Sequence, residues 1–260
     1  MNDPGNVVLK TADEIEGMNR AGTLLAKTLF EMQANIKPGV STEELDSIAD
    51  TFIRDHGGIP SFLGVPSGSP DVGPFPASIC ASVNDVIVHG IPSGIPLAEG
   101  DIIGVDCGVI LEGWHADSAV TVPVGSVSVP ASQLLTTTKQ ALDAALVAIV
   151  PGAHVGDVGA AVQGVVDGAG LAVVRRFVGH GIGRQMHEPP QVPNFGHPGS
   201  GVALVPGMTL AIEPMVNTGS ADVRFDDDGW TARTLDGALS AHFEHTVVVT
   251  EDTALVLTSE

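Results

Sequence analysis

The chain of 260 residues has no tyrosine, only two cysteines and only 11 lysines and arginines. The two cysteines, Cys80 and Cys107, cannot form a disulfide framework or a zinc finger, and their scarcity favours a reducing, cytoplasmic location. The N-terminus lacks a basic region followed by an apolar run, so no signal peptide is expected. No apolar stretch is long enough to cross a bilayer, so no membrane association is expected either.

Positive charge is so scarce that the formal net charge of the chain is −20. Because the few basic residues are scattered, the sequence offers no phosphate-binding surface, and direct binding of nucleic acid is not expected. The negative field would instead attract a cationic ligand, such as the protonated amino group of a peptide. A hydrophobic content of 43% is enough to build one large domain or two fused halves.

Two similar helix pairs are expected in the chain. Thr11 with Glu14, and Ser41 with Glu44, form capping-box signatures before amphipathic patterns that end near Met32 and at residues 57–58. A Pro-Gly turn at 38–39 separates the two patterns. The same layout returns from residue 141 to residue 170 around a Pro-Gly turn 113 residues later, at 151–152. Helices after such turns are common, so coincidence is an alternative to an internal repeat.

The repeat predicts one domain over residues 11–260, with pseudo-symmetric halves of about 11–125 and 126–260. Residues 1–10 are expected to form a flexible N-terminal segment. Each helix pair precedes strand-like segments with one histidine and two carboxylates: His89, Asp106 and Asp117 in the first half, and His180, Glu213 and Glu244 in the second. A pseudo-twofold arrangement would bring both sets to a shared central cleft.

Asp106, Asp117, His180, Glu213 and Glu244 are the candidate metal ligands. Four carboxylates with one imidazole suit a pair of divalent ions that share bridging carboxylates. A hairpin folded about residue 112 would place Asp106 nearly opposite Asp117, with Cβ atoms roughly 4.5–5.5 Å apart. Two carboxylates at that distance repel strongly unless a cation lies between them.

The other three candidates have less regular surroundings. Glycines flank His180 and would let the backbone approach a ligand closely. The proline after Glu213 favours an extended conformation, and Glu244 interrupts an apolar alternation where an unpaired buried charge would be costly. Any one acid alone could be a solvated loop or strand-end residue; the combination argues against that reading.

Four segments, in this order, resemble type I methionine aminopeptidases. They are SVNDVIVHGIP at 82–92, GHGIGR at 179–184 with HEP at 187–189, EPM at 213–215, and FEHTVVVT at 243–250. The similarity runs from about Thr11 to the C-terminus. It implies an α+β pita-bread fold, with two pseudo-symmetric halves and a central antiparallel sheet flanked by helices.

The resemblance also implies residue roles. The five candidate ligands would hold two divalent ions per chain, cobalt, manganese, iron or zinc, with Asp117 and Glu244 bridging both. A water activated between the ions would attack the scissile carbonyl, with Glu213 handling its proton. His187 would then stabilise the developing oxyanion, and His89 would contact the scissile amide nitrogen or the leaving amine.

The implied activity is removal of the initiator methionine from nascent chains whose second residue is small. The substrate would be the N-terminal methionine of nascent polypeptides, with any transient ribosome contact made by the catalytic domain. An apolar slot for the flexible thioether is expected from Phe62, Val65, Phe75, Cys80, Met186 and Trp230. Here the chain departs from the family pattern: phenylalanine is common where Met186 stands, and Pro66 to Pro74 looks like an insertion near the pocket.

Several alternatives remain open. An Xaa-Pro aminopeptidase or a prolidase would share the metal set but differ in the pocket, and a non-catalytic module would keep only the fold. His187-Glu188 is no zincin motif, because prolines follow at once, and the glycines around His180 have the wrong spacing for a dinucleotide loop. His115 and His245 lie near candidate ligands in the sequence and are candidates to support them. The Asp-Asp-Asp-Gly run at 226–229 is expected to be a solvated hairpin turn. Surface or packing roles are expected for four histidines: His56, His154, His197 and His242.

Overall fold

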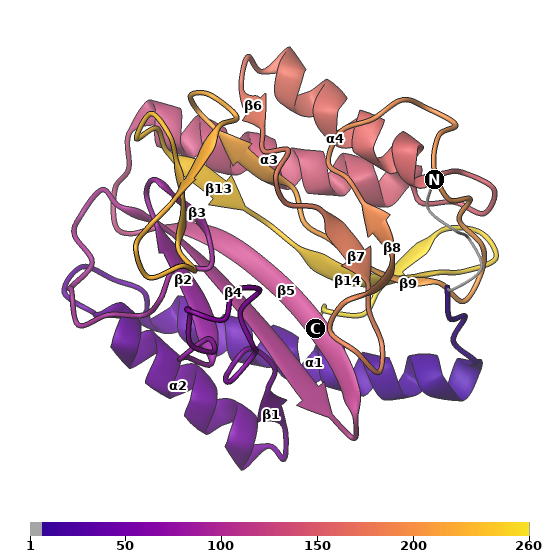
Figure 1. Cartoon of the computed structure of the whole chain (residues 1–260), viewed down its shortest axis with the longest axis horizontal. Coiled ribbons are helices and arrows are strands. Elements are labelled where there is room, and N and C mark those ends of the chain that lie inside the picture. The colour runs from indigo at the N-terminus through magenta and orange to yellow at the C-terminus, as the bar shows by residue number, and fades with distance from the viewer. Residues whose placement is uncertain (1–6, 260) are drawn as a thin grey trace.

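A computed structural model describes residues 7–259 of the chain. Four helices are found in this range: α1 (Ala12–Asn35), α2 (Thr42–Asp55), α3 (Val129–Ala148) and α4 (Val155–Gly168). The helices form two pairs, α1 with α2 and α3 with α4, which lie on opposite sides of the strands (Figure 1). This is the arrangement that the internal repeat predicts.

The helix starts follow from local capping chemistry. The Glu14 carboxylate accepts a hydrogen bond from the Thr11 N–H at 2.9 Å, and the Glu44 carboxylate accepts one from the Ser41 N–H at 2.7 Å. Both capping boxes are therefore confirmed. Helix α3 begins at Val129, well before the predicted start at residue 141, because the Ser128 hydroxyl accepts a hydrogen bond from the N–H of residue 131 at 3.3 Å.

The strands form four hydrogen-bonded sheets, and every pairing within them is antiparallel. The first sheet contains β1 (Ile59–Pro60), β2 (Ile79–Val83), β4 (Ile102–Leu111) and β5 (Trp114–Pro123). Two three-stranded sheets contain β6 (Ala172–Val173), β10 (Met215–Asn217) and β13 (Ser240–His242), and β3 (Val86–Val88), β11 (Val223–Phe225) and β12 (Ala232–Thr234). The fourth has the order β15-β14-β9-β7-β8, made of β15 (Ala254–Val256), β14 (His245–Val249), β9 (Thr209–Ile212), β7 (Gly179–Gly181) and β8 (Glu188–Val192).

The two halves meet where β5 runs beside the segment that joins β13 to β14. The Glu244 N–H donates to the Ala119 carbonyl at 2.8 Å, and the Ser118 hydroxyl donates to the Glu244 carbonyl at 2.6 Å. The Thr246 hydroxyl accepts from the Asp117 N–H at 2.9 Å and donates to the Asp117 carbonyl at 2.8 Å. This junction brings a carboxylate from each half, Asp117 and Glu244, to the centre of the molecule.

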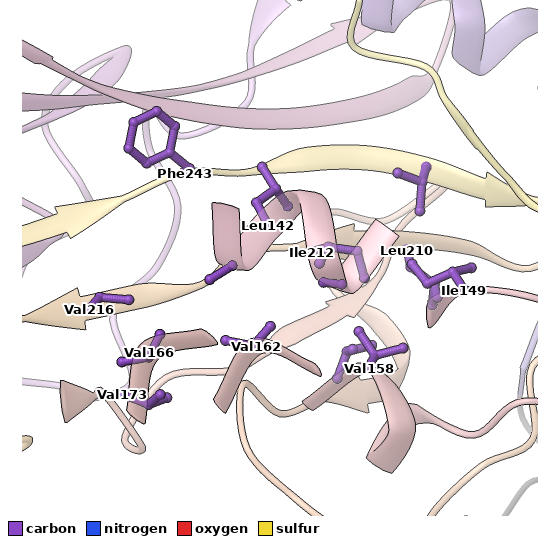
Figure 2. Packing of buried hydrophobic residues seen from close by; sticks show 14 of the residues in the cluster. Leu142, Ile149, Val158, Val162, Val166, Val173, Leu210, Ile212, Val216 and Phe243 are labelled. Atoms are coloured by element: carbon purple, nitrogen blue, oxygen red, sulfur yellow. The ribbon is translucent and has the colours of Figure 1, made fainter. Parts of the chain in front are cut away.

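Each half has its own apolar core beneath its helix pair. Leu25, Met32, Leu45 and Ile53, all fully buried, anchor α1 and α2 against the first sheet. Figure 2 shows part of the second core, in which side chains of α3 and α4 cluster with residues of β6, β9 and β10; its labelled members are Leu142, Ile149, Val158, Val162, Val166, Val173, Leu210, Ile212, Val216 and Phe243. The two cores give the central strands a rigid support from both sides.

The predicted flexible segment 1–10 falls partly on residues 1–6, which lie outside the described residues. Within the described part, the Lys10 ammonium forms a buried ion pair with Glu188 at 2.5 Å, which fastens the start of α1 beside β8. Within residues 7–259, no helix has the length and apolar character needed to cross a membrane.

Candidate active site

The five candidate ligands come from strands or strand ends of both halves. Asp106 lies in β4, Asp117 in β5 and His180 in β7. Glu213 follows directly after β9, and Glu244 lies between β13 and β14. All five line one cavity of about 340 Å³, so the structure brings together the complete predicted set.

The distances within this group suit metal coordination. Ligand atoms of Asp117, His180 and Glu244 all lie within 4.8 Å of one another. The Nε2 atom of His180 is 3.6 Å from Oε1 of Glu213 and 4.0 Å from Oδ2 of Asp117. An ion at the centre of such a group could contact several of these atoms at ordinary ligand distances of about 2.0–2.2 Å.

The β4–β5 hairpin corrects the predicted pairing of the first two acids. Asp106 is paired with Ala119, and Asp117 with Gly108, so the two acids are diagonal neighbours rather than directly opposite. The cause is a two-residue turn at positions 112–113, where both residues have positive φ, which places Leu111 opposite Trp114. Since side chains alternate with a period of two, both carboxylates still share one face.

The electrostatics of the carboxylates favour the binding of cations. Burial raises the pKa of Asp117 to about 7. Burial, and then the charge of Asp117, raise the pKa values of Asp106, Glu213 and Glu244 well above the usual range. The buried atoms Oδ1 of Asp106, Oδ1 of Asp117 and Oε1 of Glu244 have no hydrogen-bond partner among the described residues. Divalent cations would satisfy both the charge and these orphaned oxygens, so the residues fit the metals that the sequence suggests.

The His180 ring is oriented for coordination by its own strand. Its Nδ1 lies 2.9 Å from the Gly181 carbonyl, which makes Nδ1 the donor and leaves the Nε2 lone pair facing the carboxylates. Burial lowers the His180 pKa to about 4, so the ring is neutral near pH 7. The neighbouring glycines have a different use from the predicted one. A Cβ at Gly181 would collide with the Pro189 carbonyl, and one at Gly179 with the Ala211 carbonyl, so they permit close strand packing.

His89 and His187 lie beside the carboxylates in the same cavity. The His187 ring is 4.4 Å from the His180 ring, centre to centre. His89 follows β3 with a φ of 59°, a conformation that few residues other than glycine adopt, and its ring contacts those of Phe177 and Trp230 edge to face. Burial lowers the pKa of His89 to about 4. Both rings are therefore placed to make neutral hydrogen bonds to a ligand in the cavity.

His242 is the residue that the sequence reasoning missed. Its expected role was surface or packing, yet its buried Nε2 lies 3.9 Å from Glu213 and 3.8 Å from Glu244, with no hydrogen-bond partner among the described residues. Thr121 fixes its backbone, accepting from the His242 N–H at 2.9 Å and donating to its carbonyl at 2.7 Å. The sequence does contain a clue to this position. His242 lies two residues before Glu244, and residues two apart in an extended segment lie on the same face.

The apolar walls of the cavity are those expected for the substrate slot: Phe62, Val65, Phe75, Cys80, Met186 and Trp230. Trp230 packs edge to face on Phe75 at 5.2 Å, and its indole N–H donates to the Gly73 carbonyl at 3.0 Å. Pro66 also lines the cavity. The Pro66–Pro74 stretch therefore supports one wall.

The other predicted residues lie outside the centre. The ring of His115 bonds to Ser61 and that of His245 to Thr258, so neither hydrogen bond reaches a candidate ligand. The Asp226–Asp228 run forms the β11–β12 turn, as predicted. Asp226 is ion-paired with Arg224 and Arg233 rather than simply solvated.

Comparison with known proteins identifies the family of the chain. The sequence profile of metallopeptidase family M24 matches residues 16–251. The chain is 45% identical over 252 residues to the methionine aminopeptidase of Clostridium perfringens, covering 97% of this chain and 98% of that protein. It superposes on the crystal structure of the methionine aminopeptidase from Thermotoga maritima with a TM-score of 0.93 and 41% identity, covering 98% and 100% of the two chains. The chain therefore belongs to metallopeptidase family M24, in its methionine aminopeptidase branch, and the expected pita-bread fold is confirmed.

The rival enzymes share the fold at a greater distance. A prolidase from Pyrococcus furiosus superposes with a TM-score of 0.76 and 19% identity, and this chain covers only 66% of it. Likeness at this level shows a common fold alone. The sequence identities thus favour the methionine aminopeptidase interpretation over the Xaa-Pro alternative.

Proposed function

We propose that this protein removes the N-terminal methionine from nascent proteins and peptides whose second residue is small. The proposal rests on one observation. The acidic cluster, His89, His187 and the apolar slot all line the same cavity of about 340 Å³. A hydrolytic centre beside a slot for one flexible apolar side chain is what an aminopeptidase for methionine requires.

Two divalent ions are proposed to bind to Asp106, Asp117, His180, Glu213 and Glu244. The orphaned buried oxygens and the raised carboxyl pKa values support this assignment. When bound, such ions supply a water of lowered pKa and polarise the scissile carbonyl. Oxygen-rich sites with one nitrogen accept manganese, iron, cobalt or zinc, so the donor atoms suit any of these four metals.

The chain's own residues would then handle protons and orient the substrate. Glu213, whose side chain is 14% exposed, is proposed to take the proton of the attacking water and pass it to the leaving amine. His187 is proposed to donate a hydrogen bond to the oxygen that gains negative charge, and His89 to contact the scissile amide nitrogen. Their positions at the cavity wall support these roles.

The apolar walls are proposed to hold the methionine side chain. Phe75 and Trp230 would contact the thioether, for which sulfur–aromatic contacts are favourable. Both cysteines are unpaired and buried, which supports the expected cytoplasmic setting where nascent chains are the substrate.

The test incubates three tripeptides with metal-depleted protein to which each metal is returned in turn. Met-Ala-Ser should release methionine, Met-Lys-Ser should react poorly because a large second side chain must clash near the ligands, and Ala-Pro-Ala should be untouched. Release of alanine from Ala-Pro-Ala, with Met-Ala-Ser left intact, would favour the Xaa-Pro alternative instead.

A further inference from the structure

Arg175 and Arg176 are the two arginines without a polar partner in the described part of the chain. The other five have one: Arg20, Arg54, Arg224 and Arg233 form ion pairs with carboxylates, and Arg184 donates to the backbone carbonyls of residues 112 and 113. In a protein of net charge −20, two adjacent exposed arginines with no carboxylate partner are unusual. A cationic group left free in such a field is available to a ligand.

The two arginines stack on different aromatic rings and so lie on different sides of the chain. The Arg176 guanidinium is 5.8 Å from the centre of the Phe225 ring, whereas that of Arg175 is 5.0 Å from the Phe195 ring. Asp226, the acid next to Phe225, has both carboxylate oxygens occupied, one by Arg224 at 2.7 Å and the other by Arg233 at 2.6 Å. Arg176 therefore keeps its charge free.

A row of aromatic rings joins Arg176 to the catalytic cavity. His89 lies in the cavity wall, the half-buried Phe177 ring is 5.5 Å from it, and the Phe225 ring is 6.3 Å from that of Phe177. Phe225 is 46% exposed, so the row leads from the buried site to the surface. An extended peptide advances roughly 3.3 Å per residue, so the two ring-to-ring steps together span about three to four residues and reach to about the fifth position of a bound substrate.

We propose that Phe177 and Phe225 contact the substrate residues that follow the scissile bond, and that Arg176 selects substrates with an acidic side chain at the third to fifth residue of the peptide. This inference rests on the proposed methionine removal and adds a second selection beyond the small second residue. Arg176 would act as a specificity residue, because it is too far along the row to touch the reacting atoms. The contact is exposed, so its effect should be modest and should weaken as salt screens it.

The experiment measures kcat/KM of the metal-loaded protein at low salt on Met-Ala-Ala-Asp-Ala and its neutral analogue Met-Ala-Ala-Asn-Ala. Further pairs place the Asp or Asn at the third or fifth position. The Asp/Asn ratio of kcat/KM should be about two- to fivefold higher in the unaltered protein than in the Arg176→Gln variant. Arg176→Lys should retain most of the preference, and 1 M salt should abolish it.

Arg175→Gln is the matched control, because it removes the same charge one residue away but from the side facing Phe195. Its Asp/Asn ratio should equal that of the unaltered protein. An unchanged ratio in Arg176→Gln, or an equal loss in Arg175→Gln, would overturn the inference. Failure to release methionine from the neutral peptide would instead contradict the proposed function, so the two failures are distinguishable.

Discussion

At the scale of single residues, the site separates side chains that would bind metal from side chains that would bind substrate. Removing a carboxylate changes the charge of the buried cluster, whereas removing His187, which is neutral and is not a proposed ligand, changes only a hydrogen bond. Burial lowers the pKa of His187, which keeps its ring neutral near pH 7. Replacing His187 should therefore lower the rate of hydrolysis and leave the metal content unchanged.

We expect His187→Ala to keep its bound metal and to lose about 10²–10³-fold in kcat, the cost of one hydrogen bond to a developing oxyanion. Metal analysis and kinetics on the same preparation provide the measurement. Loss of a full equivalent of metal together with the rate would show that His187 is a ligand and that its assigned role is wrong.

His242 should orient the glutamates that it faces. With its Nε2 within 3.9 Å of Glu213 and Glu244, a small closure on metal binding would let it donate to one of them. His242→Phe removes that donor and should weaken metal affinity by about 10–100-fold, while His242→Gln, which keeps an N–H, should lose less. Competition with a chelating dye measures both; equal affinities in all three proteins would leave His242 as a packing residue.

The sequence alone identified the candidate ligands more readily than their surroundings. Acidic residues inside apolar stretches of sequence are conspicuous, and Asp106 and Glu244 are of that kind. His242 was missed because a histidine beside an apolar run fits a packing role equally well, and only the pairing across Thr121 fixes where its ring points.

At the scale of elements, local chemistry predicts where helices start and where the chain turns, but not which strands pair. The capping boxes of α1 and α2 depend on residues three apart, so the sequence contains all the information needed. The β4–β5 hairpin was predicted to fold about residue 112 but turns between residues 112 and 113, which depends on the positive φ of Glu112, a conformation that the sequence does not demand of a glutamate. The place of β7 between β8 and β9 depends on the pairing of His180 with Ala211, a residue distant in the chain, and no local pattern reveals it.

The position of β7 between β8 and β9 leads to a prediction about Gly181. A methyl group there would push against the Pro189 carbonyl, so Gly181→Ala should destabilise the protein by about 1–3 kcal/mol and tilt His180 away from the carboxylates. Gly164→Ala, on the exposed face of α4 with open space around it, should instead stabilise by up to about 1 kcal/mol. Urea unfolding of both variants measures the difference, and a neutral Gly181→Ala would mean that the strands can separate freely.

At the scale of the whole molecule, the internal repeat anticipated that two helix pairs would enclose a shared centre. What the repeat could not supply was the way the halves join. The hydrogen bonds between β5 and residues 244–246 place Asp117 beside Glu244 only after the chain has folded. The centre is therefore a product of the complete fold, and its buried charge should affect global stability.

The metal-free protein should become less stable as pH rises above neutrality. Buried carboxyls with raised pKa values hold protons that the unfolded chain, with pKa values near about 4, has already released. The folded state then binds more protons than the unfolded state, so the free energy of unfolding falls with increasing pH. The opposing effect of His89 and His180, whose pKa values are lowered to about 4, acts only below about pH 6.5.

Thermal unfolding of chelated protein between about pH 6.5 and 8.5 should therefore show a falling Tm. Added divalent metal should remove the fall, because metal binding favours the deprotonated carboxylates. A Tm that rises over this range without metal would show that the carboxyls are not held protonated in the folded protein.

The most direct test of the account is to measure bound metal and methionine release together in Asp117→Ala and in Asp143→Ala. Asp143 is an exposed acid on α3 that pairs with Lys139, so it controls for the loss of one carboxylate. Asp143→Ala should bind two equivalents of divalent metal and cleave Met-Ala-Ser at the unaltered rate. Asp117→Ala should bind at most one equivalent and release methionine no faster than chelated protein. Full metal content and full activity in Asp117→Ala would contradict the proposed centre.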